Sequence, residues 1–169
     1  YIYSELMPTP MLSWAVRELK CQAGIVITAS HNPAKYNGYK VYGEDGCQIT
    51  LDVANTVIGK INAVEMFGGA KVIDFEDGIK SGKIEYIKQD VIDKYLDKVA
   101  QQGVHTDLVA DSGLKVVYTP LNGTGNKPVR AILKKIGIKE VTVVPEQENP
   151  DGNFPTCPFP NPEIKEALA

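Results

Sequence analysis

The sequence predicts an α/β protein with mixed, mostly parallel sheets flanked by helices and divided into two incomplete domains. Short apolar runs rich in β-branched residues alternate along the chain with segments whose apolar residues recur at helical spacing. Turns rich in Gly, Pro and Asn separate these segments. Hydrophobic residues make up 43% and charged residues 23% of the 169 residues, a composition typical of folded proteins. This length suffices for one domain or for parts of two.

The predicted elements of the first half lead into one polar loop. Thr9 followed by Pro10 predicts a helix start, because a hydroxyl can cap a helix and proline is tolerated in its first turn. The apolar run at 24–28 predicts a buried, parallel strand. Asp45-Gly46 between two short runs predicts a hairpin. The predicted elements are a strand at 1–3, a helix ending at 19, strands at 24–28, 39–42 and 47–50, and a helix at 52–64.

The second half is predicted to contain a strand–helix–strand unit. Two strands joined by a helix usually pair in parallel, and the connection between them is right-handed in nearly all proteins. Residues 65–88 are irregular and rich in glycine, so we expect a connection between domains there, with 1–88 in one domain and 89–169 in the next. Six prolines between 145 and 162 predict a long surface loop. The predicted elements are helices near 91–103, at 127–136 and from 163 onward, and strands at 114–119 and 140–144.

Composition excludes several classes of protein. With 18 Lys and Arg against 21 Asp and Glu, the net charge of -3 argues against nucleic acid as a partner. No apolar run is long enough to cross a membrane, and the N-terminus does not resemble a signal peptide. Three widely spaced cysteines without a CxxC pattern favour reduced thiols in a cytoplasmic protein, with one disulfide as the alternative. The missing initiator Met and the uncapped C-terminal helix indicate a piece of a longer protein.

Reactive side chains gather in the loop that follows the first apolar strand, where parallel α/β sheets bind ligands. Ser30 offers a nucleophilic hydroxyl, His31 can exchange a proton near neutral pH, and Lys40 carries a positive charge. The turn dipeptides Asn32-Pro33 and Asn37-Gly38 are expected to fold the loop back and bring Lys40 toward Ser30. Residue types alone leave another interpretation open, in which Ser30 and Asn32 bond local backbone and His31 is solvated.

These residues resemble a known active-site loop. Thr28-Ala29-Ser30-His31-Asn32-Pro33, followed by Tyr36-Asn37-Gly38-Tyr39-Lys40, is similar to the loop of the α-D-phosphohexomutases, the family of phosphoglucomutase and phosphomannomutase. The resemblance extends over nearly the whole chain and is closest to the phosphoglucomutase branch with phosphopentomutase-like members. Three further segments carry it: Pro8-Thr9-Pro10, residues 119–125, and residues 150–155 with 160–163.

The resemblance implies part of a multi-domain phosphosugar mutase, an isomerase. Such an enzyme moves a phosphoryl group between C1 and C6 (or C5) of a sugar phosphate, through a phosphoserine and a sugar bisphosphate. Carried over by position, Ser30 is the expected phosphoserine, and His31 and Lys40 are its proton-handling and charge-stabilising neighbours. Substrate contacts are expected from Asn32, Tyr36 and Asn37.

The resemblance also implies sugar phosphates as partners, Mg²⁺ bound partly through the phosphate on Ser30, and a sugar 1,6-bisphosphate as activator. The family's Asp-x-Asp-x-Asp-Arg metal loop does not occur in these 169 residues and is expected just past Ala169. We therefore expect the isolated chain to lack mutase activity and to bind Mg²⁺ weakly. We also expect self-association or marginal stability, because cut sheets leave unpaired edges.

Two other classes of function stay open. One is a non-catalytic sugar-phosphate binding or regulatory module, and the other is a structural part of a larger assembly. An Asp-x-Asp-x-Asp-Arg loop beyond Ala169 would favour the enzyme. Residues 122–127 lack the spacing of a nucleotide-binding phosphate loop and are interpreted as a structural turn that opens a helix. His105 has no partner at metal-ligand spacing and is expected at the surface.

Overall fold

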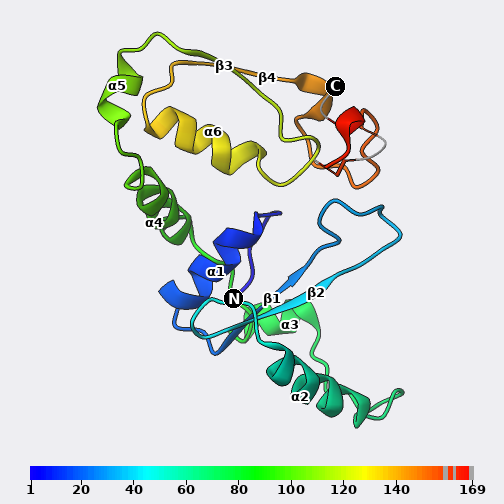
Figure 1. The fold of residues 1–169 in the computed structure, drawn as a ribbon. Helices are drawn as coiled ribbons and strands as arrows, with labels where there is room; N and C mark the ends of the chain where they lie inside the picture. The colour runs from blue at the N-terminus through cyan, green and yellow to red at the C-terminus, as the bar shows by residue number, and fades with distance from the viewer. Residues whose placement is uncertain (158–159, 162, 168–169) are drawn as a thin grey trace.

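The computed structural model describes residues 1–157, 160–161 and 163–167, and it confirms an α/β fold of helices and small sheets in two parts joined by α4, Gln89–Ala100 (Figure 1). The first part contains α1 (Thr9–Glu18), β1 (Ala23–Ile27), β2 (Tyr39–Gly43), α2 (Leu51–Asn62) and α3 (Phe75–Lys80). The second part contains α5 (Thr106–Ala110), β3 (Lys115–Tyr118), α6 (Asn126–Lys135), β4 (Glu140–Val143) and the 3-10 turns η1 (Pro145–Gln147) and η2 (Lys165–Ala167).

The first sheet is an antiparallel pair of β1 and β2, in which Ile27 lies opposite Tyr39. The prediction of a buried, parallel strand at 24–28 is therefore wrong. An apolar run reveals that a strand forms but does not reveal its partner, and a short loop returns the chain antiparallel, whereas parallel pairing needs a longer crossover. Ile25 and Ile27 also stay 51% and 60% exposed, because α1 covers the other face of the pair at Gly24.

The predicted hairpin forms in part. Gly46 adopts a left-handed φ of 76° and closes the turn, and the Gly43 N–H donates to the Cys47 carbonyl at 2.9 Å. Beyond the turn, a single antiparallel bridge joins Gln48 to Tyr42, so residues 47–50 do not form a full strand. The predicted strand at 1–3 is likewise reduced to one parallel bridge, between Ile2 and Tyr86.

The second sheet confirms the predicted parallel strand–helix–strand unit. In β3 and β4, Lys115 lies opposite Glu140 and Tyr118 lies opposite Val143, and α6 connects the two strands. Gly137, with a φ of 100°, ends α6 in the left-handed conformation that glycine adopts easily. Of the two sheets in the described part of the chain, one is antiparallel and one parallel, so the expected mixture is present but a parallel majority is not shown.

The other helices agree with the sequence in part. The helices predicted near 52–64 and 91–103 form as α2 and α4, whereas α3 and α5 lie in stretches for which no helix was predicted. Thr9 begins α1 instead of capping it, because Pro8 occupies the cap position. The helix expected from 163 is a 3-10 turn over the described residues, and its last positions, 168–169, lie outside them. Residues 158–159 and 162 of the predicted proline-rich loop also lie outside the described residues.

Among the described residues, most of the buried apolar side chains lie in α1 and α4. Met11 and Val16 of α1 and Val91 and Leu96 of α4 are buried, and Val16 lies against Gly24 of β1. The Trp14 indole N–H donates to the Val91 carbonyl at 3.3 Å, which joins the two helices across the apolar contact. This core fixes the first part of the chain against the helix that leads into the second.

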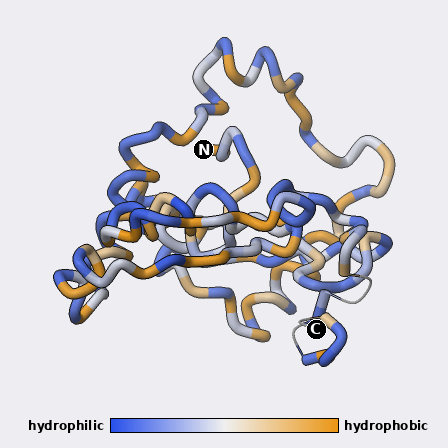
Figure 2. Tube along the Cα trace, turned by 90° about the horizontal axis from the view of Figure 1, so that it is seen from above, coloured by the Kyte–Doolittle hydropathy of each residue, from blue (hydrophilic) through white to orange (hydrophobic). Residues whose placement is uncertain are grey.

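Many apolar side chains lie outside this core. Figure 2 shows orange, apolar stretches along the outer segments of the trace, and Leu51, Met66 and Phe67 are 82%, 87% and 85% exposed. Such exposed apolar surface is consistent with the expected self-association, which stays a prediction. Among the described residues, no helix is both long and apolar enough to cross a lipid bilayer.

Candidate active site at the ends of β1 and β3

A cleft of about 510 Å³ lies where the loop after β1 meets the loops after β3 and η1. In Figure 1, the long loop between β1 and β2 points toward the orange C-terminal segment. Both β1 and β3 end at this cleft, as expected for a ligand site in an α/β protein. One wall includes Thr28, Ser30 and His31, and the opposite wall includes Leu121, Asn122, Gly123, Thr124, Asp151 and Gly152.

Ser30 is exposed at the first wall and adopts an uncommon backbone conformation. Its φ of 58° lies in the left-handed region, which non-glycine residues rarely occupy because the Cβ crowds the backbone. The Ser30 N–H donates to Thr28 Oγ1 at 3.0 Å, a local bond that favours this conformation. The loop therefore presents the hydroxyl directly after the end of β1.

His31 lies within reach of that hydroxyl. Ser30 Oγ and His31 Nδ1 are 3.3 Å apart, and either atom can donate, depending on the imidazole tautomer. In the tautomer with a bare Nδ1, the ring can accept the hydroxyl proton and so increase the nucleophilicity of the oxygen. A nucleophile beside a proton acceptor at an open cleft can form and break a covalent bond to a bound group.

The remaining predicted site residues lie outside the cleft lining. Lys40 is half-buried in β2 opposite Val26, because the Thr28 N–H bonds the Gly38 carbonyl and strand pairing resumes there. The structure therefore does not bring Lys40 into the cleft beside Ser30. Three exposed residues of the loop, Asn32, Tyr36 and Asn37, are likewise not among the residues that line the cleft.

The second wall is held by a buried side chain that the sequence analysis did not single out. Asn122 is only 6% exposed, and its Nδ2 donates to the carbonyls of Asn149 and Glu146 at 2.9 and 3.3 Å. Its backbone N–H donates to Gln147, and its carbonyl accepts from Asp151, each at 2.9 Å. A signal was present in the sequence: Asn-Gly after a strand suits left-handed residues, and Asn122 has a φ of 55°.

An ion pair connects the two parts of the chain beside the cleft. Lys127, in the first turn of α6, binds Glu5 of the N-terminal segment. Arg130, one turn further along α6, binds Glu148 at 2.6 Å and fixes the helix to the segment after β4. Together these contacts hold α6 and its preceding loop against both neighbours.

The described residues contain no cluster of metal-ligating side chains. No group of three His, Cys, Asp or Glu side chains among them lies close enough together to hold a metal ion. In the cleft, Asp151 offers a carboxylate, but its Oδ1 already accepts the Asn153 N–H at 2.9 Å. Mg²⁺ prefers octahedral oxygen coordination, toward which Asp151 could supply one carboxylate.

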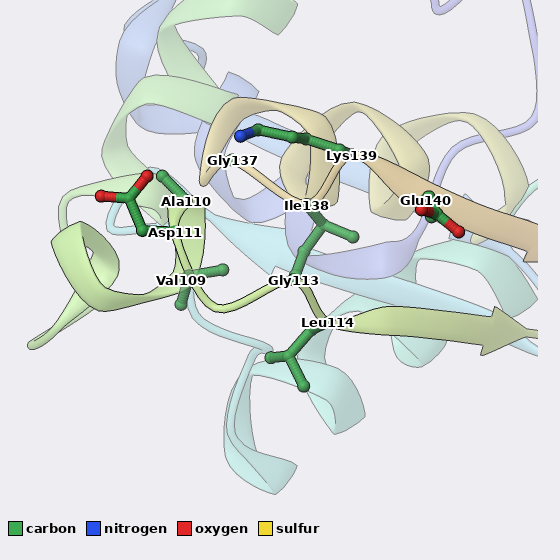
Figure 3. A pocket seen from close by; sticks show the side chains of 9 residues that line it. All are labelled: Val109, Ala110, Asp111, Gly113, Leu114, Gly137, Ile138, Lys139 and Glu140. Atoms are coloured by element: carbon green, nitrogen blue, oxygen red, sulfur yellow. The ribbon is translucent and has the colours of Figure 1, made fainter.

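A second cavity, of about 210 Å³, lies near α5 at the opposite ends of β3 and β4 (Figure 3). The close-up shows Val109, Ile138 and Leu114 around it, with Asp111 and Lys139 at its edges. Its lining contains no serine, cysteine or histidine, so it offers no nucleophile comparable to Ser30.

Known proteins similar to this chain share the predicted family. The chain is 39% identical to a phosphoribomutase from Saccharomyces cerevisiae, over 97% of this chain and 28% of that protein. It is 38% identical to a phosphoglucomutase from Staphylococcus saprophyticus, over 95% of this chain and 28% of that protein. It is also 36% identical to glucose 1,6-bisphosphate synthase from Homo sapiens, over 99% of this chain and 27% of that protein. The chain thus spans less than a third of the length of these relatives.

The structural and family comparisons agree. A crystal structure of a phosphomannomutase-type protein from Thermus thermophilus matches with a TM-score of 0.67 and 25% identity, over 90% of this chain and 31% of that one. Residues 1–67 match the model of phosphoglucomutase/phosphomannomutase, alpha/beta/alpha domain I, and residues 93–169 match domain II of the same family. The resemblance stated from the loop residues is confirmed: the chain belongs to the phosphoglucomutase/phosphomannomutase family, the α-D-phosphohexomutases, and matches its first two domains.

Proposed function

We propose that this chain is the phosphoserine-bearing part of a phosphosugar mutase, an isomerase that moves a phosphoryl group between C1 and C6 (or C5) of a sugar phosphate. One observation carries the proposal: exposed Ser30 stands at the end of β1, with its Oγ 3.3 Å from His31 Nδ1. The cleft in front of it is large enough for a sugar phosphate. The names of similar proteins include phosphoribomutase, phosphoglucomutase and phosphomannomutase, and they support the class of reaction but not one sugar.

In the proposed charging step, a sugar 1,6-bisphosphate donates one phosphoryl group to Ser30. A bond forms between Oγ and phosphorus while the bond from phosphorus to the sugar oxygen breaks. The Oγ proton passes to His31 Nδ1 and then to the departing sugar oxygen, so protons and charge balance. In a turnover, the phosphoserine gives its phosphoryl group to the free hydroxyl of a sugar monophosphate, which forms the bisphosphate and frees Oγ. The bisphosphate then turns over in the site and its other phosphoryl group returns to Ser30, which leaves the isomer and restores the phosphoserine.

The proposed domain division places 1–88 in the C-terminal part of domain I and 89–169 in the N-terminal part of domain II. The separate matches over 1–67 and 93–169 support a boundary between these ranges. We infer that Mg²⁺ is held mainly by a loop that follows residue 169 in the complete enzyme, with the phosphate on Ser30 as one ligand. When bound, the ion would neutralise charge on the transferred group.

The other proposed roles depend on residues outside the cleft lining. Lys40 is proposed to stabilise charge on the phosphoryl group, and Asn32, Tyr36 and Asn37 are proposed to bind the substrate. Asn32, Tyr36 and Asn37 are exposed and Lys40 is half-buried, which supports access of a ligand to these side chains. A sugar 1,6-bisphosphate is the proposed activator, and a cytoplasmic location is proposed with it. Similarity to a glucose 1,6-bisphosphate synthase supports the involvement of a bisphosphate.

The test is phosphorylation of the complete protein that carries this chain by glucose 1,6-bisphosphate, with intact mass and peptide mapping as readouts. We expect one added phosphate, located on Ser30. Ser30→Ala is expected to abolish it and to lower mutase turnover by about 10³-fold or more, because the nucleophile is gone. Ser112→Ala is the matched control, since Ser112 is also exposed but bonds the Val109 carbonyl away from the cleft.

Two outcomes would contradict the proposal. Phosphate on a residue other than Ser30, or full turnover by Ser30→Ala, would remove the phosphoserine. Binding of sugar phosphates without any phosphorylation would instead favour the non-catalytic binding module. For the isolated chain, calorimetry is expected to show weak Mg²⁺ binding, and tight binding would contradict the placement of the metal ligands beyond residue 169.

A further inference from the structure

We propose that Thr28 and Gly38 are positioning residues that set the conformation of Ser30 for phosphoryl transfer. The inference rests on the proposed function and extends it to two residues that do not react themselves. It follows from a continuous set of contacts that begins at the β1–β2 pair and ends at the Ser30 hydroxyl.

The first contact holds Ser30 itself. With a φ of 58°, its backbone lies in a region that serine does not favour, so a specific interaction must select it. The Thr28 hydroxyl supplies that interaction, because Oγ1 accepts the Ser30 N–H at 3.0 Å. Since the φ of Ser30 decides where Cβ and Oγ point, this bond also decides the distance from Oγ to His31 Nδ1.

The second contact holds Thr28. The Thr28 N–H donates to the Gly38 carbonyl at 2.9 Å and continues the strand pairing one step past Ile27 and Tyr39. A Cβ at position 38 would lie 2.2 Å from the Thr28 carbonyl oxygen, far closer than atoms approach in real proteins. The obstacle is backbone and cannot rotate away, so any side chain at 38 must push Thr28, and with it the acceptor of the Ser30 N–H.

The opposite wall contains the same arrangement and supports this interpretation. Thr119 follows the end of β3 as Thr28 follows the end of β1, and the Leu121 N–H donates to Thr119 Oγ1 at 3.0 Å. Leu121 is left-handed as well, with a φ of 48°. At both strand ends, a threonine two residues upstream therefore accepts the N–H of a left-handed, non-glycine residue.

The first experiment compares Thr28→Val, Thr28→Ser and Thr56→Val in the complete enzyme. Valine keeps the shape of threonine but removes the acceptor, whereas serine keeps it. Thr56 lies in α2, where its hydroxyl bonds the Asp52 carbonyl outside the cleft. We expect Thr28→Val to lower kcat, and the rate of Ser30 phosphorylation, by about tenfold or more, because small misplacement of a reacting group is costly. KM and the melting temperature should change little, and Thr28→Ser should restore most of the rate.

A second pair of variants tests Gly38. Gly38→Ala is expected to lower kcat at least as much as Thr28→Val, while Gly59→Ala in α2, where an added Cβ meets nothing within 4 Å, should leave kcat unchanged. If Gly38→Ala fails to fold, the comparison of valine with serine at position 28 still decides the question.

The results separate this inference from the proposed function. Wild-type enzyme that takes no phosphate on Ser30 would refute the proposed function. Normal phosphorylation of wild type together with a wild-type kcat for Thr28→Val would refute the positioning role alone. Equal losses for the valine and serine variants would also refute it, because the acceptor would then not be the feature that matters.

Discussion

The two walls of the cleft are built from loops that begin alike and then differ. After β1 and after β3, a threonine hydroxyl accepts the N–H of a left-handed residue, Ser30 in one loop and Leu121 in the other. Beyond this shared start, Ser30 stays exposed, whereas Asn122 is buried and bonded to the segment after β4. The loop with the nucleophile is therefore open, and the loop that faces it is fixed.

This difference suits the proposed chemistry. A phosphoserine must meet two different hydroxyls of one sugar, so the first wall needs an accessible oxygen and few constraints beyond the Thr28 bond. The second wall gains most from being rigid, because a preorganised surface loses little entropy when a ligand binds. The comparison predicts that substitutions in the first loop change chemistry, and that substitutions in the second change stability.

The largest effect on stability is expected at Asn122. Asn122→Ala removes both side-chain bonds and leaves the Asn149 and Glu146 carbonyls without these donors, in a partly buried place. We expect the free energy of unfolding to fall by about 2 kcal/mol, as when buried polar groups lose their partners. Urea denaturation measures this, with exposed Asn55→Ala in α2 as the control.

A further variant separates the lost bonds from the backbone. Asn122→Gly also lacks the side-chain amide, but glycine adopts the left-handed φ of 55° without strain. The free energy of unfolding of Asn122→Gly should therefore lie between those of Asn122→Ala and wild type. Ser30→Ala should leave the free energy of unfolding nearly unchanged. Equal destabilisation by the substitutions at 30 and 122 would show that the two walls do not differ in the way described.

Sequence alone predicted the parts of the fold that depend on local pattern. The helices α2, α4 and α6 and the parallel β3–α6–β4 unit were predicted, because these features depend on residues that are close together in the sequence. The pairing of β1 was not predictable in the same way. A run such as 23–27 fits either direction, and the choice depends on the chain that returns beside it.

The features of the candidate site likewise divide into those that follow from local sequence and those that depend on distant residues. The exposure of Ser30 after a strand and its neighbour His31 follow from the order of residues, and family resemblance supplied their proposed roles. Lys40 lies in β2 opposite Val26 and is not among the residues that line the cleft, because the backbone bond between Thr28 and Gly38 keeps position 40 within the paired strand. The role of Asn122 depends on residues about 25 positions away, a distance over which side-chain and backbone partners cannot be inferred from pattern.

A smaller effect is expected at Tyr3 in the N-terminal segment, whose hydroxyl donates to the Met11 carbonyl of α1 at 2.9 Å. Burial, together with the nearby Tyr95, raises the pKa of Tyr3 to about 12. Because an unfolded tyrosine has a pKa near 10, the folded state keeps its proton more tightly. The resulting stability is fully present below about pH 10 and is lost as the pH rises through about 12. After allowance for partial exposure, we expect a loss of about 1 kcal/mol.

Denaturation at a series of alkaline pH values measures this loss. Tyr3→Phe keeps the ring but removes both the titrating hydroxyl and its bond to the Met11 carbonyl. Its free energy of unfolding should therefore be lower than that of wild type at neutral pH and should fall less between pH 10 and 12. Tyr1→Phe is the control, because Tyr1 is 65% exposed. An unchanged pH slope in Tyr3→Phe would show that Tyr3 does not carry the effect.

The smallest effect is expected from the ion pair that connects the two parts of the chain beside the cleft. Lys127 binds Glu5 across the two parts of the chain, whereas Lys115 binds Glu140 at 3.0 Å within the second sheet. Both lysines are exposed, so Lys127→Ala and Lys115→Ala should each change the free energy of unfolding by less than about 1 kcal/mol. Of the two variants, only Lys127→Ala should raise KM for the sugar phosphate in the complete enzyme, because the Lys127 pair joins the two parts of the chain, whereas the Lys115 pair lies within the second sheet. Equal KM values for the two variants would mean that the apolar contact between α1 and α4, and not this ion pair, sets the width of the cleft.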